Sequence, residues 1–312
     1  MGFGDHSVVL LTGAKGMLGS SILRKLEREN SKVLSPSSEA LDLRDPLATL
    51  SFIKSNDVGT IIHCAARVGG IAANIEQPAD FILTNLQIDT SLLSAARQQK
   101  VRNLLYFGSS CMYPRNANQP MNESAILTGP LEPTNQGYAL AKISATEVIS
   151  SVQKQDLLNW KVLVLSNLYG PRDNYNPRSS HLIAAIITKI HDARQRALSE
   201  VEIWGSGKSR REFTFVDDIA EFVVSQIDKI SEWEPVMNLG SGVDYTINEY
   251  YQIVSEIMGY RGRFVHDLTK PDGMPKKLMD SSLAKKLGWR PRTNLRLGLK
   301  KAIDWFEEGT IW

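Results

Sequence analysis

A glycine-rich turn close to the N-terminus constrains the fold of this chain more than any other feature of its sequence. Gly13, Gly16 and Gly19 are spaced three apart within "TGAKGMLG", which follows the apolar run "SVVLL" and opens the helical pattern "MLGSSILRKLERE". This arrangement is typical of a dinucleotide-binding βαβ unit. Its first glycine permits a tight turn, its second lets backbone N–H groups approach a pyrophosphate, and its third allows close helix–sheet packing. The alternative is an ordinary strand–helix turn.

Short apolar runs alternate with helical patterns through the first half of the chain, which predicts βαβ units and a parallel sheet. The strands expected after the first are "KVLS", "TIIHCAA", "NLLYFGSS" and "KVLVLSNLYG". The expected helices cover residues 80–98, 137–154 and 181–198. Because "TIIHC" and "NLLYF" are apolar without alternation, we expect these strands to be covered on both faces.

The segment after the second predicted strand bears on which dinucleotide binds. Sheets that bind NAD usually carry an Asp or Glu at the end of this strand, where it accepts hydrogen bonds from the ribose hydroxyls. Here the strand ends in "VLSPSS", and no acid comes before Glu39. Lys15 in the glycine turn could meet a 2′-phosphate, to which Ser37 and Ser38 could donate hydrogen bonds. We therefore expect NADP(H), with NAD(H) as the alternative.

These patterns predict an α/β fold, with a Rossmann-type doubly wound parallel sheet and a smaller C-terminal substrate-binding α/β region. Regular alternation stops near Ser166, where Pro and Gly become denser. We expect residues 1–165 to form an NADP-binding Rossmann domain, to which later segments can return, and residues 166–312 to form mainly a substrate-binding domain. Ligands of open α/β sheets bind at the carboxyl ends of the strands, so the second region should cap that edge.

The charge balance and the cysteine count exclude several classes of protein. The 36 Lys and Arg residues against 34 Asp and Glu residues give a net charge of +2, so no broad basic surface for nucleic acid is expected. No apolar run approaches the ~20 residues that cross a bilayer, and the first residues lack a secretory signal. Two cysteines are too few for a disulfide framework, and no Cys/His cluster has zinc-site spacing. We expect a soluble cytoplasmic protein that binds no nucleic acid, membrane or metal.

Tyr138 and Lys142 stand four residues apart in "YALAK", so they share one face of a predicted helix. A nearby ammonium favours the phenolate form of a tyrosine, whose pKa is ordinarily about 10, and so lets it exchange protons near neutral pH. The alternative is that Tyr138 and Lys142 are two ordinary solvated side chains on the surface of a helix. With the glycine turn and the serine that ends "NLLYFGS", the pair resembles the extended short-chain dehydrogenase/reductase superfamily. The resemblance implies that Ser109 is the catalytic serine, Tyr138 the proton donor and Lys142 its helper.

Longer blocks resemble one family within that superfamily. "GSSCMYP", "SNLYGPRDNYNP", "WGSGKSRREFTFVDDIA" and "KPDGMPKKLMD" are similar to signature blocks of the GDP-L-fucose synthases, from near Leu10 to Trp289. The resemblance implies a bifunctional epimerase-reductase (oxidoreductase and isomerase) that inverts C3 and C5 of GDP-4-keto-6-deoxy-D-mannose and reduces C4 with NADPH. It also implies that Cys111 and His181 transfer the protons. The ordinary pKa values of a thiol and an imidazole, about 8.5 and 6.5, bracket neutral pH.

The same resemblance implies two sets of binding residues. The cofactor-binding set is Gly13, Lys15, Gly16, Met17, Leu18, Gly19, Ser38, Asp42, Leu43, Ala65, Gly108, Ser109, Lys142, Asn167, Leu168 and His181. The set for the nucleotide sugar is Lys189, Trp204, Arg211, Asp272 and Lys277. The chain departs from the family where Lys15 and Ser38 stand at positions that are often arginine, and where Ser166 replaces a common threonine.

Some candidate residues could also have a purely structural role. A cysteine that follows a buried strand, such as Cys111, is often a small packed hydrophobe. We expect Cys64 to belong to the core of the third strand. His6, His63, His191 and His266 show no partners in the sequence that suggest metal binding or acid–base chemistry.

Two other functions compete with the epimerase-reductase. One is a nucleotide-sugar 4-epimerase or dehydratase with tightly held NAD, which needs no Cys111/His181 pair and, as a dehydratase, usually has acids where Cys111 and Met112 stand. The other is a catalytically silent NADP-binding scaffold or redox sensor, which predicts loss of Ser109, Tyr138 or Lys142. We also expect a homodimer, by analogy alone, through the helices near residues 81–98 and 138–154.

Overall fold

The computed structural model describes residues 8–177, 179–270 and 272–309. At its centre is a parallel sheet of six strands in the order β2-β1-β3-β4-β5-β9. These strands are β1 (Val8–Thr12), β2 (Val33–Leu34), β3 (Val58–His63), β4 (Asn103–Ser109), β5 (Asn159–Leu165) and β9 (Val236–Leu239). The chain runs outward from β1 to β2 and then returns to β3 on the other side of β1. This confirms the predicted Rossmann-type doubly wound α/β fold.

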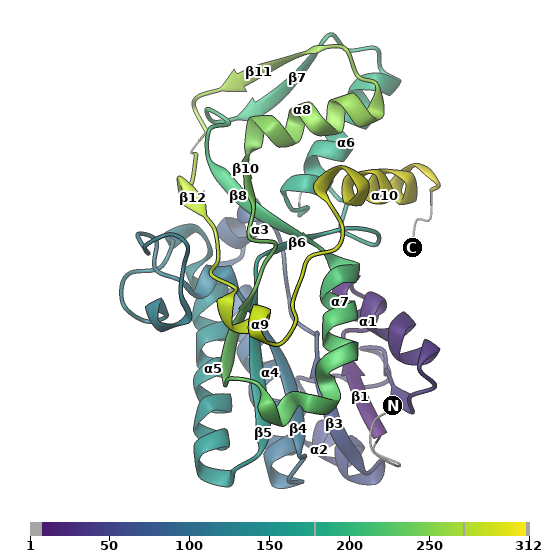
Figure 1. Cartoon of the computed structure of the whole chain (residues 1–312), viewed down its shortest axis with the longest axis vertical. Coiled ribbons are helices and arrows are strands. Elements are labelled where there is room, and N and C mark those ends of the chain that lie inside the picture. The colour runs from purple at the N-terminus through teal and green to yellow at the C-terminus, as the bar shows by residue number, and fades with distance from the viewer. Residues whose placement is uncertain (1–7, 178, 271, 310–312) are drawn as a thin grey trace.

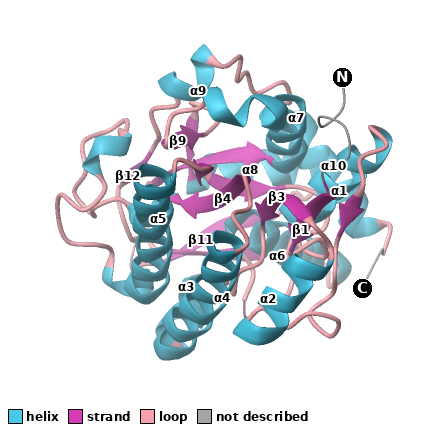
Figure 2. Cartoon of the chain, turned by 90° about the horizontal axis from the view of Figure 1, so that it is seen from below, coloured by secondary structure: helices cyan, strands magenta, loops and turns pink. Residues whose placement is uncertain are grey.

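Helices cover both faces of the parallel sheet (Figure 2). Alternate side chains of a strand point to opposite faces, so Leu10 and Leu104 pack on one face while Val9 and Leu105 pack on the other. The first face carries α2 (Pro46–Ser55), α4 (Pro78–Gln98) and α5 (Gln136–Asp156), and the second carries α1 (Met17–Arg28) and α7 (Val216–Gln226). Burial on both faces is the reason that these strands are continuously apolar.

The second half of the chain builds a smaller region beyond the carboxyl ends of the parallel strands (Figure 1). One sheet has the order β10-β8-β12, with β6 also paired to β8, and a separate pair joins β7 to β11. The strands are β6 (Asn167–Tyr169), β7 (Glu200–Trp204), β8 (Arg210–Phe215), β10 (Asp244–Thr246), β11 (Arg263–Asp267) and β12 (Lys276–Lys277). The helices α6 (Leu182–Gln195), α8 (Ile247–Met258) and α10 (Leu295–Glu307) pack with them around a separate core.

Short elements complete the chain. They are α3 (Ile71–Glu76), α9 (Ser282–Lys286) and the 3₁₀ turns η1 (Ser110–Met112), η2 (Glu123–Ala125), η3 (Pro133–Asn135) and η4 (Ile227–Glu232). Of these, η1 follows β4 directly and η3 leads directly into α5, so both turns lie where the large sheet meets the smaller region.

The structure differs from the sequence-based prediction at two strands. The single strand expected over residues 161–170 is broken at Ser166, whose hydroxyl hydrogen-bonds Thr214 (2.7 Å). The break lets β5 stay in the large sheet while β6 joins β8. The strand expected over residues 60–66 ends at His63, so Cys64 lies just past it, partly buried against the core. Pairing with segments distant in sequence decides both boundaries.

Helices α4 and α5 are 21 residues long each and lie side by side on one face of the sheet. An ion pair joins their C-terminal ends, with Arg97 Nε 2.6 Å from the Asp156 carboxylate. Their outer surfaces carry exposed apolar side chains, among them Leu83, Leu140 and Val148. None of the helices in the described ranges is both long enough and apolar enough to cross a membrane.

Candidate active site

The glycine turn after β1 has the geometry that a bound pyrophosphate requires. Gly13 has a φ of +69°, and a Cβ there would lie 2.6 Å from the backbone nitrogen of Ala65. A Cβ on Gly19 would collide with the carbonyl oxygen of Gly13, so this glycine keeps the helix against the turn. Gly16 is the N-cap of α1 and has no side chain to occupy the N–H groups of the first helical turn. The residues therefore fit an anionic group at the helix N-terminus.

The structure places the segment after β2 beside this turn. Lys15 Nζ lies 3.6 Å from the Glu39 carboxylate, and both side chains are about three-quarters exposed. A hydrogen bond from Ser37, followed by smaller effects that include Lys15, lowers the pKa of Glu39. Asp42 faces Arg44, whose side-chain hydrogen bonds lower the pKa of this carboxyl to about 2, while Leu43 is buried in the core. Lys15, its partner Glu39 and the hydroxyl of Ser37 thus lie together at one exposed edge beside the glycine turn.

Ser109, Tyr138 and Lys142 come together at the carboxyl end of β4. The Ser109 side chain interacts with the phenol of Tyr138, and its oxygen also accepts the N–H of Cys111 (3.3 Å). Lys142 Nζ lies 5.9 Å from the ring centre of Tyr138. Burial raises the pKa of Tyr138, with Cys111 and Asp89 adding to the effect, so the phenol keeps its proton at neutral pH. The phenolate that we expected from the nearby ammonium is therefore not favoured in the protein without ligands.

Cys111 lies in η1, two residues after Ser109, and two donors point at its sulfur. Asn135 Nδ2 lies 3.0 Å from Sγ, and Lys277 Nζ lies 3.6 Å from it. The sulfur also interacts electrostatically with Arg211 and Tyr138. The sequence reasoning missed Asn135, although it stands only three residues before Tyr138 in η3. These polar surroundings differ from those of a packed, inert thiol.

His181 is the N-cap residue of α6, and burial lowers the pKa of its imidazole. The preceding loop is held against the segment that follows β3, because the Gly70 N–H donates to Ser179 O (3.0 Å). A Cβ on Gly70 would lie 2.6 Å from Ser180 O, so only glycine permits this approach. His181 thus comes from a different element than Cys111, and no hydrogen bond among the described residues joins the two.

The residues expected to bind the nucleotide sugar form two groups. Lys189 Nζ lies 5.3 Å from the ring centre of Trp204, whose indole is half exposed. Asp272 accepts hydrogen bonds from the backbone N–H (2.6 Å) and the hydroxyl of Ser206. Arg211 donates to Met274 O (2.5 Å), and it interacts electrostatically with Asp272 as well as with Cys111. Arg211 therefore brings the second group next to the thiol. Trp204 of the first group is the last residue of β7.

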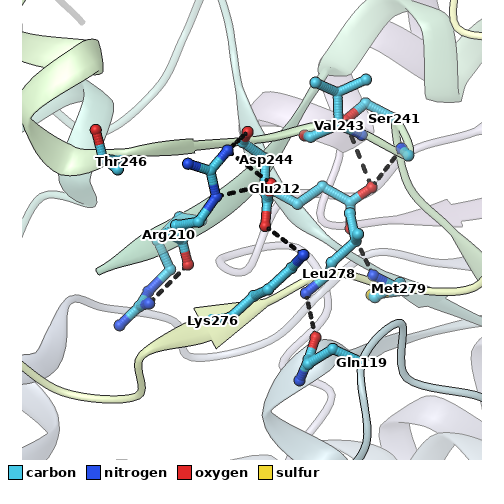
Figure 3. Close-up of polar contacts among 12 residues, drawn as sticks. Gln119, Arg210, Glu212, Ser241, Val243, Asp244, Thr246, Lys276, Leu278 and Met279 are labelled. Carbon is cyan, nitrogen blue, oxygen red and sulfur yellow. Dashed lines mark hydrogen bonds and ion pairs between the residues drawn. The ribbon is translucent and has the colours of Figure 1, made fainter. Parts of the chain in front are cut away.

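A buried carboxylate, that of Glu212, lies among the strands that carry Arg211 and Lys277 (Figure 3). Glu212 accepts the N–H of Gly242 (2.6 Å) and of Met279 (3.0 Å), and it is 1% exposed. Burial raises the pKa of Glu212 to about 7. Arg210 on the same strand and Lys276 on β12 both pair with Asp244 on β10. These contacts fix β8, β10 and β12, and with them Arg211 and Lys277, yet no pattern in the sequence pointed to Glu212.

The remaining cofactor candidates lie along the ends of the same strands. Asn167 and Leu168 begin β6, and the Asn167 amide donates to Glu212 O (3.1 Å). Gly108 precedes Ser109, and a Cβ there would lie 2.9 Å from Met112 Sδ. Met17 and Leu18 open α1, directly beside the glycine turn. All of these positions adjoin the carboxyl edge of the large sheet.

His63 has two buried hydrogen-bond partners that the sequence did not indicate. His63 Nδ1 lies 2.6 Å from Thr12 Oγ1, and Nε2 lies 3.1 Å from the Asp89 carboxylate. His266 Nε2 lies 2.9 Å from Asn248 Oδ1, and His191 packs edge-on against Phe306. His6 lies outside the described residues. Within the described ranges, no group of three His, Cys, Asp or Glu side chains could hold a metal ion.

The comparisons with known proteins agree with this geometry. Residues 9–240 match the NAD dependent epimerase/dehydratase family. The chain is 43% identical to the putative GDP-L-fucose synthase 2 of Arabidopsis thaliana (97% of this chain, 92% of the relative) and 42% identical to the GDP-L-colitose synthase of Yersinia pseudotuberculosis (96% and 97%). A GDP-mannoheptose C4 reductase from Campylobacter jejuni, solved with NADP bound, superposes with a TM-score of 0.87 at 30% identity, covering 97% and 98% of the two chains.

Proposed function

Because this chain belongs to the NAD dependent epimerase/dehydratase family and, within it, to the GDP-L-fucose synthases, we propose that it makes GDP-L-fucose. It inverts C3 and C5 of GDP-4-keto-6-deoxy-D-mannose and reduces the C4 ketone with NADPH. The observation that carries this proposal is the turn after β4, where Ser109, whose side chain interacts with Tyr138, stands two residues from a thiol at which two polar donors point. One short segment thus supplies groups for both chemical steps.

NADP(H) is the cofactor, and it supplies the hydride when bound. The glycine turn and the start of α1 hold the pyrophosphate, while Lys15 and Ser38 meet the 2′-phosphate. Lys142 donates a hydrogen bond to the nicotinamide ribose, with Asn167 and Leu168 close to the nicotinamide. The other cofactor contacts come from Met17, Leu18, Asp42, Leu43, Ala65, Gly108 and His181.

Ser109 and Tyr138 carry out the reduction of the ketone. The phenol keeps its proton at neutral pH, since burial raises its pKa, and so it donates that proton to the C4 oxygen as the hydride arrives. The Ser109 hydroxyl, beside the same phenol, polarises the carbonyl. Lys142 is the cation beside them that stabilises the charge left on Tyr138.

Cys111 and His181 exchange the protons at C3 and C5. A ketone at C4 makes the protons on both neighbouring carbons acidic, because each carbanion is delocalised onto the same oxygen as an enolate. One group removes a proton, and the other returns one from the opposite face of the ring. Asn135 Nδ2 and Lys277 Nζ point at the Cys111 sulfur. At each inversion the group that removes the proton must lack one and its partner must hold one. Burial lowers the pKa of the His181 imidazole, so its protonated form gives that proton up readily.

Lys189, Trp204, Arg211, Asp272 and Lys277 bind the nucleotide sugar. Arginine and lysine suit the diphosphate, the half-exposed indole of Trp204 offers an aromatic face, and Asp272 accepts from hydroxyls. Residues 1–165, joined by α7 and β9, form the NADP-binding domain, and residues 166–312 form mainly the substrate-binding domain. The protein is a cytoplasmic homodimer that pairs through α4 and α5, whose outer faces carry exposed Leu83, Leu140 and Val148.

Product analysis tests this function. The protein is mixed with NADPH and GDP-4-keto-6-deoxy-D-mannose, and the sugar nucleotide is identified by NMR. We expect GDP-L-fucose, with oxidation of one NADPH for each product molecule. Since one relative is named for a different sugar, colitose, the identity of the product decides the matter and oxidation of NADPH alone does not. A product that retains the configuration at C3 or C5 would overturn the proposal.

A further inference from the structure

A chain of buried polar side chains runs beneath the candidate site, from the glycine turn to Lys142. Thr12 at the end of β1 contacts His63 (2.6 Å), His63 contacts Asp89 on α4 (3.1 Å), and the Tyr106 hydroxyl donates to the other oxygen of Asp89 (2.7 Å). The face of the Tyr106 ring lies 4.3 Å from Lys142 Nζ. All five side chains are at most 4% exposed. So many polar and charged side chains are seldom buried together in a protein interior.

The direction of each hydrogen bond follows from Asp89. An ionised carboxylate only accepts, so His63 Nε2 must carry the proton and Nδ1 must accept from the Thr12 hydroxyl. The Thr12 oxygen also accepts the Ala65 N–H (3.2 Å), next to the glycine turn. Every member is satisfied and the imidazole is held in one tautomer, which is the condition under which a buried polar network is stable.

The charges around Lys142 single out Asp89. The titratable groups that face the Lys142 ammonium are Tyr106 on β4, Tyr138 on its own helix, Cys64 and His63 at the end of β3, and Asp89 on α4. Burial raises the pKa values of both phenols and of the Cys64 thiol, and burial lowers the pKa of His63. All four are therefore neutral near pH 7. Asp89, whose pKa is lowered through His63, Lys142 and Tyr106, is the group among them that carries a negative charge.

Lys142 needs such a partner. Burial lowers the pKa of its ammonium. The charge of Asp89 raises this pKa more than any other neighbouring group does and so opposes the effect of burial. Tyr106 bridges the two charges, because its hydroxyl holds the carboxylate while its ring face attracts the ammonium. Removing Asp89 would leave a cation in the interior with no counter-charge, which favours loss of its proton.

We propose that Asp89 is the counter-charge that keeps Lys142 protonated, and that Thr12, His63 and Tyr106 are positioning residues that hold this carboxylate beneath the site. The role given to Lys142 rests on the proposed function, but its state of protonation does not. The network further connects the turn that binds the pyrophosphate to the helix that carries Tyr138 and Lys142. The same buried contacts therefore hold both the cofactor-binding turn and the proton donor in position.

The direct test is an NMR titration of the Lys142 side chain in protein labelled with ¹³C-lysine, with the signal assigned through the Lys142→Arg variant. The parent protein, Asp89→Asn and Tyr106→Phe are compared from about pH 7 to about pH 10.5. We expect Lys142 in Asp89→Asn to lose its proton at least about one pH unit earlier than in the parent, a tenfold change in the protonation equilibrium. Tyr106→Phe, which keeps the ring face, should show a smaller shift in the same direction.

Asp218→Asn is the matched control, because Asp218 is also a buried carboxylate, held by Arg292 and Thr293 on the other side of the sheet. It should leave the Lys142 titration unchanged. A second readout is the NADPH dissociation constant, measured by fluorescence without any sugar nucleotide, which should rise about tenfold with pH in Asp89→Asn and less than about twofold in the parent. Lys142 titrations that coincide in the parent, Asp89→Asn and Tyr106→Phe overturn the inference, whatever product the enzyme makes.

Discussion

The ammonium of Lys277 lies 3.6 Å from the sulfur of Cys111, although the two residues are 166 positions apart in the chain. The contact forms because β12 pairs with β8 and brings Lys277 over the turn that follows β4. The sequence predicts that Lys277 binds the substrate. In the protein without ligands its ammonium contacts the thiol of Cys111. The ammonium therefore faces the atom at which a cysteine reacts.

The first prediction concerns the reactivity of Cys111. In a Cys64→Ser background Cys111 is the single cysteine of the chain, so the rate of alkylation by iodoacetamide reports on it alone. Lys277→Met should slow alkylation at neutral pH about five- to tenfold, because the sulfur loses a nearby positive charge. Lys276→Met is the matched control, since the neighbouring lysine pairs with Asp244 instead. Equal rates in the two variants would contradict a role for Lys277.

The second prediction concerns the choice of cofactor. Lys15→Ala should weaken NADPH binding about tenfold and leave NADH binding unchanged, because a charge-assisted hydrogen bond to the 2′-phosphate is lost. Both dissociation constants are measured by nicotinamide fluorescence, with the exposed Lys32→Ala as the control. Equal weakening of NADPH and NADH would remove Lys15 from recognition of the phosphate.

The third prediction concerns acid stability. Burial lowers the folded-state pKa of His63 below its ordinary value of about 6.5. Below that pH the unfolded chain binds a proton that the folded protein does not, so the free energy of unfolding falls as the pH falls. One such histidine contributes up to about 1.4 kcal/mol per pH unit.

His63→Gln should therefore reduce the slope of unfolding free energy against pH by up to this amount between about pH 6.5 and about pH 5. Urea unfolding at several pH values measures the slope independently of any overall loss of stability. His266→Gln, at an exposed histidine, should keep the parent slope. A His63→Gln slope equal to that of the parent would mean that the buried imidazole is already protonated.

The fourth prediction separates the two chemical steps. Tyr138→Phe should lower the rate of ketone reduction about 10²- to 10⁴-fold, since the general acid is lost. NADPH oxidation with the keto-sugar measures this rate. Tyr113→Phe is a fitting control, because Tyr113 is also a buried phenol but donates to Asn238 (2.5 Å). A rate in Tyr138→Phe close to that of the parent would show that another group donates the proton.

Local sequence patterns predicted the glycine turn, the parallel sheet and the pairing of Tyr138 with Lys142, since each depends on residues within one or two elements. The partners of Cys111 could not be predicted in this way, because Lys277 reaches it through strand pairing. The same holds for His63, which looks like an ordinary strand residue until α4 brings Asp89 against it. The break at Ser166 depends on Thr214 and β8, whereas the apolar pattern continues straight through it.

The central claim is that one site uses Cys111 to exchange carbon-bound protons and Tyr138 to reduce the ketone. Its most direct test is NMR of the sugar nucleotide after incubation in D₂O with Cys111→Ser, alongside the parent and Cys64→Ser. The account predicts deuterium at C3 and C5 with the parent and with Cys64→Ser. With Cys111→Ser it predicts none at either carbon and an unchanged affinity for NADPH. Deuterium at both carbons in Cys111→Ser, at the rate of the parent, would contradict it.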